Sequence, residues 1–343
     1  MITIRTQGED RLVETNTVGK GCWIDARNVS REDLSRLEHE FGIAGELLTD
    51  IMDTDEQARI EKEDEYTAII VRLPVYDETC EVSFFTLPLG IILFPDKIVT
   101  ICQRSSEALN DLLNNRVKGF SIRNKSTFVL NLLGRGAFTY LKSLKELNKR
   151  TNIIKEELQK SIKNNELIQL LSIQKSLVFF TTSITTNELL LEKLQKSPLI
   201  RFKEDERELL EDVVTENKQA IEMAKIYSSI LTGTMDAFAS VISNNLNIVM
   251  KRLTIVSIVL MIPTLIYSFF GMNVRLPFAN LPAAGWGILI ISLLISILGA
   301  ILLNTGRRRK KISPKILPYT LSSALPSALP STLSSTGPRA LGA

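Results

Sequence analysis

One stretch of this chain places small or weakly polar side chains at intervals of three or four residues inside an apolar, uncharged sequence. Residues at that spacing share one face of an α-helix, and apolar residues such as Ile255, Ile258 and Ile262 occupy the other sides. Such a stripe can line a polar path through a membrane. Small polar residues also mediate tight packing between membrane helices, so the spacing alone leaves both interpretations open. The stripe consists of Asn247, Met250, Thr254 or its neighbour Leu253, Ser257, Met261, Thr264 and Ser268.

Two apolar spans near the C-terminal end must position this stripe. Residues 253–273, which end in Gly271-Met272-Asn273, and residues 283–303 contain no charged side chain. Each span has roughly the 20 residues that a helix needs to cross the hydrocarbon core of a bilayer. The sequence therefore predicts a first transmembrane pore helix over 253–273, an external loop over 274–282 and a second transmembrane helix over 283–304.

The cations that flank the spans predict their orientation. Lys251 and Arg252 precede the first span, a basic cluster at 307–311 follows the second, and the loop between them carries only Arg275. By the positive-inside rule, both termini are expected on the cytoplasmic side of the cell membrane. Residues 1–20 show no apolar signal-peptide core, so the chain before the first span is expected to stay in the cytoplasm. Residues 305–343 are predicted to form a cytoplasmic basic cluster and low-complexity tail.

Composition excludes several classes of protein. The 41 Lys and Arg against 38 Asp and Glu give a net charge of +3, which carries no bulk electrostatic signal for nucleic acid. Cys22, Cys80 and Cys102 show no CxxC spacing and the chain has a single histidine, so a dedicated soft-metal site is not expected. We find no Walker loop, Rossmann fingerprint, HExxH motif or Ser/His/Asp set, and we predict that the protein is not an enzyme.

The N-terminal part, residues 1–125, is predicted to be a cytoplasmic α/β domain. Short apolar runs with β-branched residues and proline or aspartate punctuation predict strands at 21–25, 67–73, 89–94 and 97–101. Ser30, followed by acidic residues, is typical of a helix N-cap, and the helix is expected to end near 41–42. A second helix is predicted around 45–51.

Long helices follow. Leucine and isoleucine recur at helical spacing from Ser126 onward, which predicts a cytoplasmic helical hairpin over 126–198 with its turn at Asn164-Asn165. A stalk helix is predicted over 199–252. If it continues into the first span, about 65 residues at 1.5 Å each make a rod of about 100 Å. Such a rod needs neighbours to pack against, which favours an oligomer.

Gly271-Met272-Asn273, at the end of the first of two C-terminal spans, resembles the motif of the CorA magnesium channel family. The likeness covers most of residues 20 to 311. It includes Asp236, Ser243-Asn244, Asn247, Met250-Lys251, Leu253-Thr254, Met261, Pro263-Thr264, Tyr267 to Asn273, Trp23-Ile24-Asp25, Phe41-Gly42-Ile43 and Leu47 to Ile51. The resemblance implies a funnel-shaped homopentamer with an N-terminal α/β domain, a long α-helical stalk and two transmembrane helices. It also implies import of Mg²⁺, with Co²⁺ and Ni²⁺ as further candidate ions.

The resemblance assigns roles to particular residues. Gly271, Met272 and Asn273 are the expected selectivity filter, and Asp236 is an acidic ring at the cytoplasmic end of the pore. Regulatory Mg²⁺ between neighbouring subunits is expected at Asp50 and Asp212. Two departures stand out. Thr49 replaces an acid that the family often carries, for which Asp53 or Asp55 could substitute, and the outer loop at 274–280 has no acidic residue.

The neutral character of these residues suits magnesium. Mg²⁺ holds its water shell tightly. Amide oxygens of Asn273 and carbonyl oxygens of Gly271 can hydrogen-bond to that shell without stripping it, whereas rings of carboxylates would hold a dication too firmly for it to leave. Met250, Leu253 and Met261 could form apolar constrictions that block permeation by dewetting.

Two alternatives stay open. A zinc or other transition-metal transporter could use the same scaffold, but zinc-transporting relatives usually depart from methionine at the middle position of the motif, so Met272 favours magnesium. A non-transporting receptor with a coiled-coil stalk would predict spans without the polar stripe.

Overall fold

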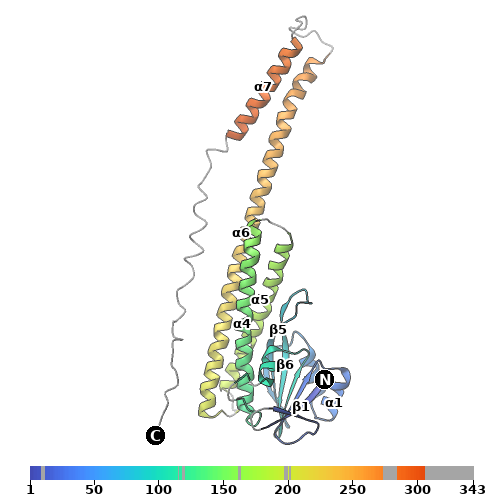
Figure 1. The fold of residues 1–343 in the computed structure, drawn as a ribbon, viewed down its shortest axis with the longest axis vertical. Helices are drawn as coiled ribbons and strands as arrows, with labels where there is room; N and C mark the ends of the chain where they lie inside the picture. Colours follow the sequence, from blue (N-terminus) through green and yellow to red (C-terminus); the bar gives the residue numbers. More distant parts are fainter. Residues whose placement is uncertain are drawn as a thin grey trace. The chain divides into compact units, whose positions relative to one another are not determined.

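The computed structural model describes residues 1–8, 12–114, 116–117, 120–160, 164–196, 200, 202–272 and 284–305. The chain falls into two compact units, Met1–Ile242 and Ser243–Ala343, and each is described by itself. The strands are β1 (Ile2–Gln7), β2 (Leu12–Thr15), β3 (Cys22–Arg27), β4 (Arg59–Lys62), β5 (Thr67–Tyr76), β6 (Phe84–Leu93) and β7 (Lys97–Cys102). The helices are α1 (Arg31–His39), α2 (Gly45–Met52), α3 (Glu107–Leu113), α4 (Lys125–Lys160), α5 (Asn164–Lys196), α6 (Glu204–Phe270) and α7 (Ala284–Thr305) (Figure 1).

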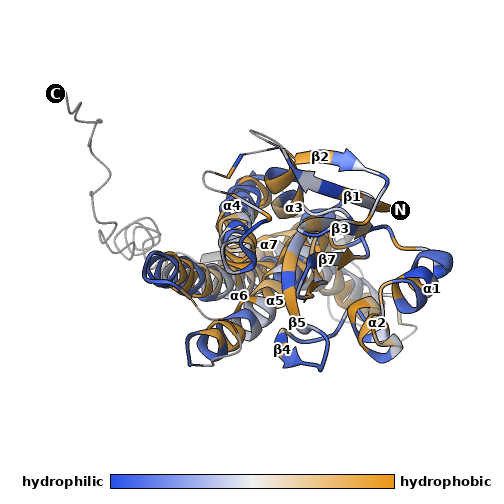
Figure 2. Cartoon of the chain, turned by 90° about the horizontal axis from the view of Figure 1, so that it is seen from below, coloured by the Kyte–Doolittle hydropathy of each residue, from blue (hydrophilic) through white to orange (hydrophobic). Residues whose placement is uncertain are grey.

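A seven-stranded sheet in the order β2-β1-β3-β7-β6-β5-β4 organises the first unit. Only β3 and β7 pair in parallel among these neighbours; the other pairs are antiparallel. Because successive side chains of a strand point to opposite faces, the side chains of β5 and β6 belong alternately to two separate hydrophobic cores. Ile70 and Ile92 pack with α1 and α2 on one face. Ile69 and Ile91 pack with α3, α4, α5 and α6 on the other (Figure 2).

The predicted strands and the first two helices are all present. Ser30 caps α1 by a capping box: its hydroxyl accepts from the Asp33 N–H at 3.1 Å, and the Asp33 carboxylate accepts from the Ser30 N–H at 3.1 Å. The N-terminal ammonium of Met1 lies 2.8 Å from the same carboxylate. Hydrogen bonds from this ammonium and from Ser30 lower the pKa of Asp33. The helix ends at His39, slightly before the predicted 41–42.

Helices α4, α5 and the first part of α6 pack together beside the sheet (Figure 1). Their core holds residues such as Tyr140, Phe180 and Ile221. The stalk helix predicted over 199–252 is the first part of α6, which begins at Glu204, and α5 begins at the asparagine pair where the turn was predicted. The turn itself, residues 161–163, lies outside the described residues.

Helix α5 is long and apolar enough to cross a membrane by length and composition. Many of its apolar side chains pack inside the first unit, while others, such as Ile168, Val178 and Leu189, are exposed. Leu190, Leu191 and Leu194 join the core on the sheet, and Leu177 and Phe180 join the core shared with α4 and α6. We therefore interpret α5 as a core helix.

A buried arginine joins α5 to the sheet. Arg72 of β5 is 8% exposed, and no described carboxylate lies within ion-pair distance of it. Its guanidinium donates to the Ser183 hydroxyl of α5 at 2.8 Å, to the Thr86 hydroxyl of β6 at 2.9 Å and to the Thr54 carbonyl at 2.9 Å. It also donates to the Glu56 carbonyl. Burial lowers the pKa of Arg72, so these bonds must offset a real desolvation penalty.

Arg72→Met is expected to lower the free energy of unfolding by about 2–4 kcal/mol, because it leaves the buried hydroxyls and carbonyls without a donor. Denaturant unfolding of the detergent-solubilised protein, followed by fluorescence of the buried Trp23, measures the effect. Arg36→Met on the exposed surface of α1 is the matched control and should leave the midpoint unchanged. An Arg72→Met variant as stable as wild type would contradict this account of the network.

Candidate functional site

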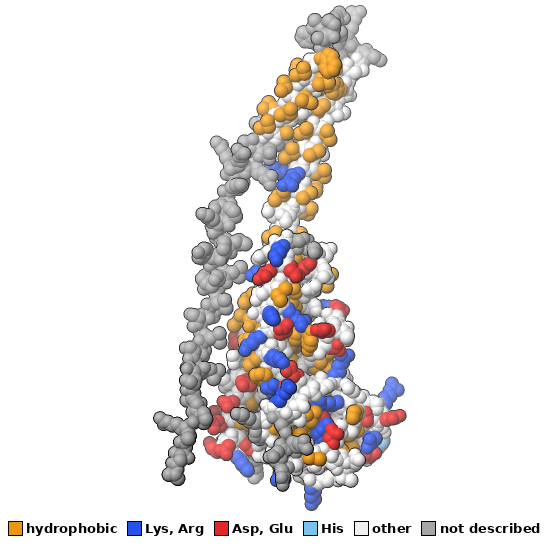
Figure 3. Space-filling model, viewed as in Figure 1, with side chains coloured by type: hydrophobic (Ala, Val, Ile, Leu, Met, Phe, Trp, Pro, Cys, Tyr) orange, Lys and Arg blue, Asp and Glu red, His pale blue; other side chains and the backbone are white. Residues whose placement is uncertain are grey.

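In the second unit, α7 packs against the C-terminal part of α6 through small residues. Ser292 and Ser296 of α7 are only 2% and 4% exposed. A Cβ on Gly299 would lie 3.6 Å from Cδ1 of Ile262 on α6, an ordinary contact distance. Small residues let membrane helices approach closely, which is the arrangement expected of two adjacent spans. Hydrophobic side chains cover much of the surface of this unit, while charged side chains gather on the first (Figure 3).

The contact with α7 leaves the polar stripe of α6 uncovered. Half-buried residues toward α7 are Ile255, Ile258, Val259, Ile262 and Ile266. All the stripe residues are exposed, and at 3.6 residues per turn they lie on roughly the opposite face. They are Asn247, Met250, Leu253, Thr254, Ser257, Met261, Thr264 and Ser268. The structure thus assigns helix packing to the serines of α7 and leaves the stripe of α6 available for another role.

Three hydroxyls of the stripe donate to backbone carbonyls within α6. Thr254 donates to the Met250 carbonyl at 2.9 Å, Ser257 to the Leu253 carbonyl at 3.0 Å and Thr264 to the Leu260 carbonyl at 2.9 Å. Because each proton is already used, the hydroxyl oxygens keep acceptor lone pairs. Such oxygens can accept hydrogen bonds from water molecules around a cation.

Ser296→Leu should destabilise the pairing of α6 with α7 by about 1–3 kcal/mol, because the larger side chain overpacks a closed contact. Thermal unfolding in mild detergent, read by loss of the assembled species on size exclusion, measures the change. Ser296→Ala keeps the small volume and should behave like wild type. Equal thermal stability of Ser296→Leu and Ser296→Ala would rule out the contact.

The motif residues follow the end of α6. The Gly271 N–H donates to the Tyr267 carbonyl at 2.8 Å, and a Cβ on Gly271 would lie only 3.1 Å from that oxygen. Any larger side chain at this position must therefore shift the backbone by a few tenths of an ångström. Met272 is exposed. The prediction for Asn273 concerns a residue outside the described range, as do those for Arg275 and the loop at 274–282, the basic cluster at 307–311 and the tail.

Asp50 lies on α2 and is already paired with a cation of the same chain. Its carboxylate is 2.6 Å from Nη2 of Arg59, on β4. Arg59 also pairs with Glu56 and, at 2.7 Å, with Glu61. The residue beside it, Thr49, has no carboxylate, and its hydroxyl donates to the Gly45 carbonyl at 2.9 Å. Asp53 and Asp55, the predicted substitutes, are exposed and follow α2 directly.

Asp212 lies on α6, on the opposite side of the sheet from α2, so Asp50 and Asp212 of one subunit belong to different surfaces. It is exposed and lines a hollow of about 310 Å³ together with Asn131, Arg135 and Glu216. Burial and the nearby Asp212 raise the pKa of Glu216. Arg116 and Arg135 line the same hollow, so charges of both signs lie beside Asp212. Asp236 is exposed further along the same helix.

No group of three His, Cys, Asp or Glu side chains in the part of the chain that the structure describes is arranged to hold a metal ion. Asp50 and Asp212 of a single chain therefore form no metal site. A regulatory ion at these residues would need carboxylates from two chains.

Sequence reasoning missed three residues that shape these surfaces. Arg59 is one charge among several in a polar segment, and only strand pairing of Arg59 with Ile70 brings it to Asp50. Arg72 sits in an apolar run that predicts a strand and nothing more. Ser296 carried a usable signal, because Ser292, Ser296 and Gly299 recur at the spacing of a small-residue packing face.

Comparison with known proteins bears on this arrangement. A sequence profile of the CorA-like Mg²⁺ transporter proteins matches residues 19–309. The cobalt/magnesium transport protein CorA of Methanocaldococcus jannaschii is 27% identical over 281 residues, which are 80% of this chain and 87% of that protein.

Solved structures share the fold. The complete structure of the CorA magnesium transporter from Methanocaldococcus jannaschii aligns with a TM-score of 0.73 at 24% identity, over 90% of this chain and 98% of that chain. The ZntB cytoplasmic domain from Vibrio parahaemolyticus aligns with a TM-score of 0.55 at 10% identity, over 71% of this chain and 98% of that chain. At these identities the structural likeness shows the fold alone. The profile match covers more than half of the chain, and with it the chain belongs to the family of CorA-like Mg²⁺ transporter proteins.

Proposed function

We propose that this protein is a passive channel that imports Mg²⁺ down its electrochemical gradient, along an axis surrounded by the α6 stripes of several subunits. The observation that carries the proposal is the uncovered polar stripe opposite the α7 contact, which ends at Gly271 and Met272. Asn273 would complete the selectivity filter. Membership in a family of transporters, one relative of which is named a cobalt/magnesium transport protein, supports the choice of cargo.

The proposed path would handle Mg²⁺ with its water shell largely in place. Stripping that shell is costly, and neutral oxygens of Asn247, Thr254, Ser257 and Thr264 can accept hydrogen bonds from it. The absence of charge within the span keeps each binding step weak enough for the ion to leave. Asp236 would concentrate cations at the cytoplasmic end of the path.

Apolar side chains on the same face would close the path when the channel is at rest. Met250, Leu253 and Met261 are exposed on α6, at 53%, 59% and 64%. Rings of such side chains in a narrow pore exclude water and so block a hydrated ion. An inside-negative membrane potential supplies the driving force, about 2.3 kcal/mol per charge per 100 mV. The basic residues that flank the spans support a cytoplasmic location for both termini.

Flux into liposomes loaded with a Mg²⁺-sensitive dye tests the proposal. Mg²⁺ should enter in response to an inside-negative potential, and Co²⁺ and Ni²⁺ run in parallel define the range of ions. Preferential uptake of Zn²⁺ would favour the transition-metal alternative on the same scaffold. Absence of any divalent flux from correctly assembled protein would overturn the proposal.

We also propose that the assembly is a homopentamer. The motivation is the 67-residue helix α6, whose apolar window has none of its residues buried within a single chain. A helix with that much unpartnered apolar surface needs neighbours or lipid along its length. Native mass spectrometry in mild detergent is expected to give five subunits, and a stable monomer or dimer would contradict this prediction.

Cytoplasmic Mg²⁺ is proposed to close the channel by bridging Asp50 of one subunit and Asp212 of the next. Facing carboxylates repel one another unless a cation lies between them, so ion binding would stabilise the symmetric closed assembly. The exposure of Asp212 on α6 supports the choice of this surface.

A further inference from the structure

The carboxylate of Asp50 is neutralised within its own subunit by Arg59. A single guanidinium pairs with three acids: with Asp50 at 2.6 Å, with Glu61 at 2.7 Å and with Glu56. The Arg59 side chain is 23% exposed, so these pairs lie in partly desolvated surroundings. Burial alone would lower the pKa of Arg59, but the hydrogen bonds with Glu61 and Asp50 raise it. Arg59 therefore stays charged under all ordinary conditions.

We infer that Arg59 is a built-in competitor of the regulatory divalent cation, and that the ion reaches Asp50 only when the guanidinium leaves it. This inference rests on the proposed regulatory role of Asp50. A dication that approaches the Asp50–Arg59 pair meets a carboxylate whose charge is already balanced and a guanidinium that repels it. Competition of this kind sets the ion concentration at which the channel closes.

Arg59 can release Asp50 without becoming an unpaired charge. Glu56 and Glu61 both remain within reach, so the cost of a partly buried cation without a partner is avoided. Hydrogen bonds from Arg72 hold the segment that carries Glu56. Arg72 donates to the carbonyls of Thr54 and Glu56 and to the hydroxyl of Ser183 on α5. The retained partner is thus held in place while the exchanged one is free to bind an ion.

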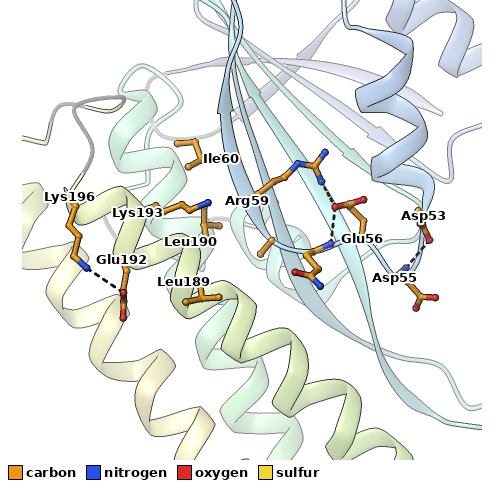
Figure 4. Close-up of a pocket in the computed structure, with 12 residues that line it drawn as sticks. Asp53, Asp55, Glu56, Arg59, Ile60, Leu189, Leu190, Glu192, Lys193 and Lys196 are labelled. Atoms are coloured by element: carbon orange, nitrogen blue, oxygen red, sulfur yellow. Dashed lines mark hydrogen bonds and ion pairs between the residues drawn. The ribbon is translucent and has the colours of Figure 1, made fainter.

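Solvent reaches Arg59 through a cleft of about 900 Å³. One wall is the segment from Asp53 to Ile60 and the other is the C-terminal end of α5, with Leu189, Lys193 and Lys196 (Figure 4). In the close-up, Arg59 extends from its strand toward Glu56 and away from α5. The exchange of partners at Arg59 consequently needs no opening of the protein core.

The test uses Arg59→Gln in the full-length, reconstituted protein. Two readouts are followed against free Mg²⁺: protection of the cytoplasmic part from limited proteolysis, and inhibition of Mg²⁺ flux. Loss of the competing charge should shift both midpoints to lower Mg²⁺ by roughly three- to tenfold. If Arg59 only supports the structure, its loss would instead weaken ion binding and raise the midpoints.

Matched variants separate the local charge from other effects. Arg59→Lys keeps the charge and should stay close to wild type. Arg36→Gln removes the same charge from α1, where Arg36 pairs with Glu40, and should shift neither midpoint. In an Asp50→Asn background, Arg59→Gln should have no further effect, because the carboxylate for which the two cations compete is gone.

A complementary variant keeps the inference testable if Arg59→Gln fails to fold. Glu61→Gln removes an exposed alternative partner of Arg59, so the guanidinium should hold Asp50 more tightly and the midpoints should rise relative to Glu63→Gln, a neighbouring exposed acid. Wild-type protein without any Mg²⁺ protection would overturn both the proposed regulation and this inference. Protection in wild type, with midpoints in Arg59→Gln unchanged or raised, would overturn only the competition by Arg59.

Discussion

Asn273→Ala is expected to reduce Mg²⁺ flux to less than roughly a tenth of the wild-type rate while the oligomer stays intact. In the proposed filter, the substitution removes from every subunit an amide that hydrogen-bonds to the water shell of the ion. One hydrogen bond contributes about 0.5–1.5 kcal/mol, and a difference of about 1.4 kcal/mol is already tenfold. Dye-based flux into liposomes measures the rate, and size exclusion reports on assembly.

The matched control for this prediction is Asn280→Ala, which removes the same amide from the segment that follows the motif. It should conduct like wild type. Gly271→Ala is a second variant of the filter, because its new Cβ would lie 3.1 Å from the Tyr267 carbonyl and displace the backbone that presents the motif. Wild-type flux in Asn273→Ala would show that the filter is formed by other residues.

Local patterns predicted much of the fold because their signals are contained in a few neighbouring residues. The capping box of Ser30 and Asp33 needs only a four-residue window, and the strands at 67–73 and 97–101 have an apolar, β-branched composition. Strand β4 was missed. It has four residues, three of them charged, and lies at the edge of the sheet, where pairing with β5 and the ion pairs of Arg59 stabilise it. No local propensity encodes these contacts.

The sequence predicted one part of the candidate site, and only the structure showed the other. The stripe from Asn247 to Ser268 lies on one helix, so its spacing alone placed the residues on one face. The partner of Asp50, Arg59, lies only nine residues further along the chain, but it reaches Asp50 because β4 pairs with β5. The hydrogen-bond network of Arg72 depends on contacts more distant in sequence. Arg72 meets Ser183, which lies 111 residues further along the chain, and a single sequence offers no pattern that links them. The charge balance at Asp50 therefore became apparent only from the folded chain.

The regulatory proposal leads to a second large expected effect, the loss of Mg²⁺-dependent protection in Asp212→Lys. In wild type, an ion bound only in the closed assembly stabilises it by RT ln(1 + [L]/Kd), about 2.7 kcal/mol at a hundredfold excess over Kd. Lysine removes the carboxylate and supplies a fixed positive charge where the ion would bind. Limited proteolysis of this variant should proceed at the same rate with and without Mg²⁺, and flux should no longer fall as cytoplasmic Mg²⁺ rises.

Glu222→Lys provides the control for Asp212→Lys, since it makes the same change of charge at an exposed position on α6, where Glu222 pairs only with Lys225 among the described ion pairs. It should retain the Mg²⁺ dependence of wild type. In the proposed interface, Thr49 stands beside Asp50 and supplies no carboxylate, so each carboxylate that does bind the ion should carry more of the binding energy. Loss of Asp212 is for that reason expected to remove the response rather than weaken it. If Asp212→Lys kept both the protection and the inhibition by Mg²⁺, the sensing site would have to lie elsewhere on the protein.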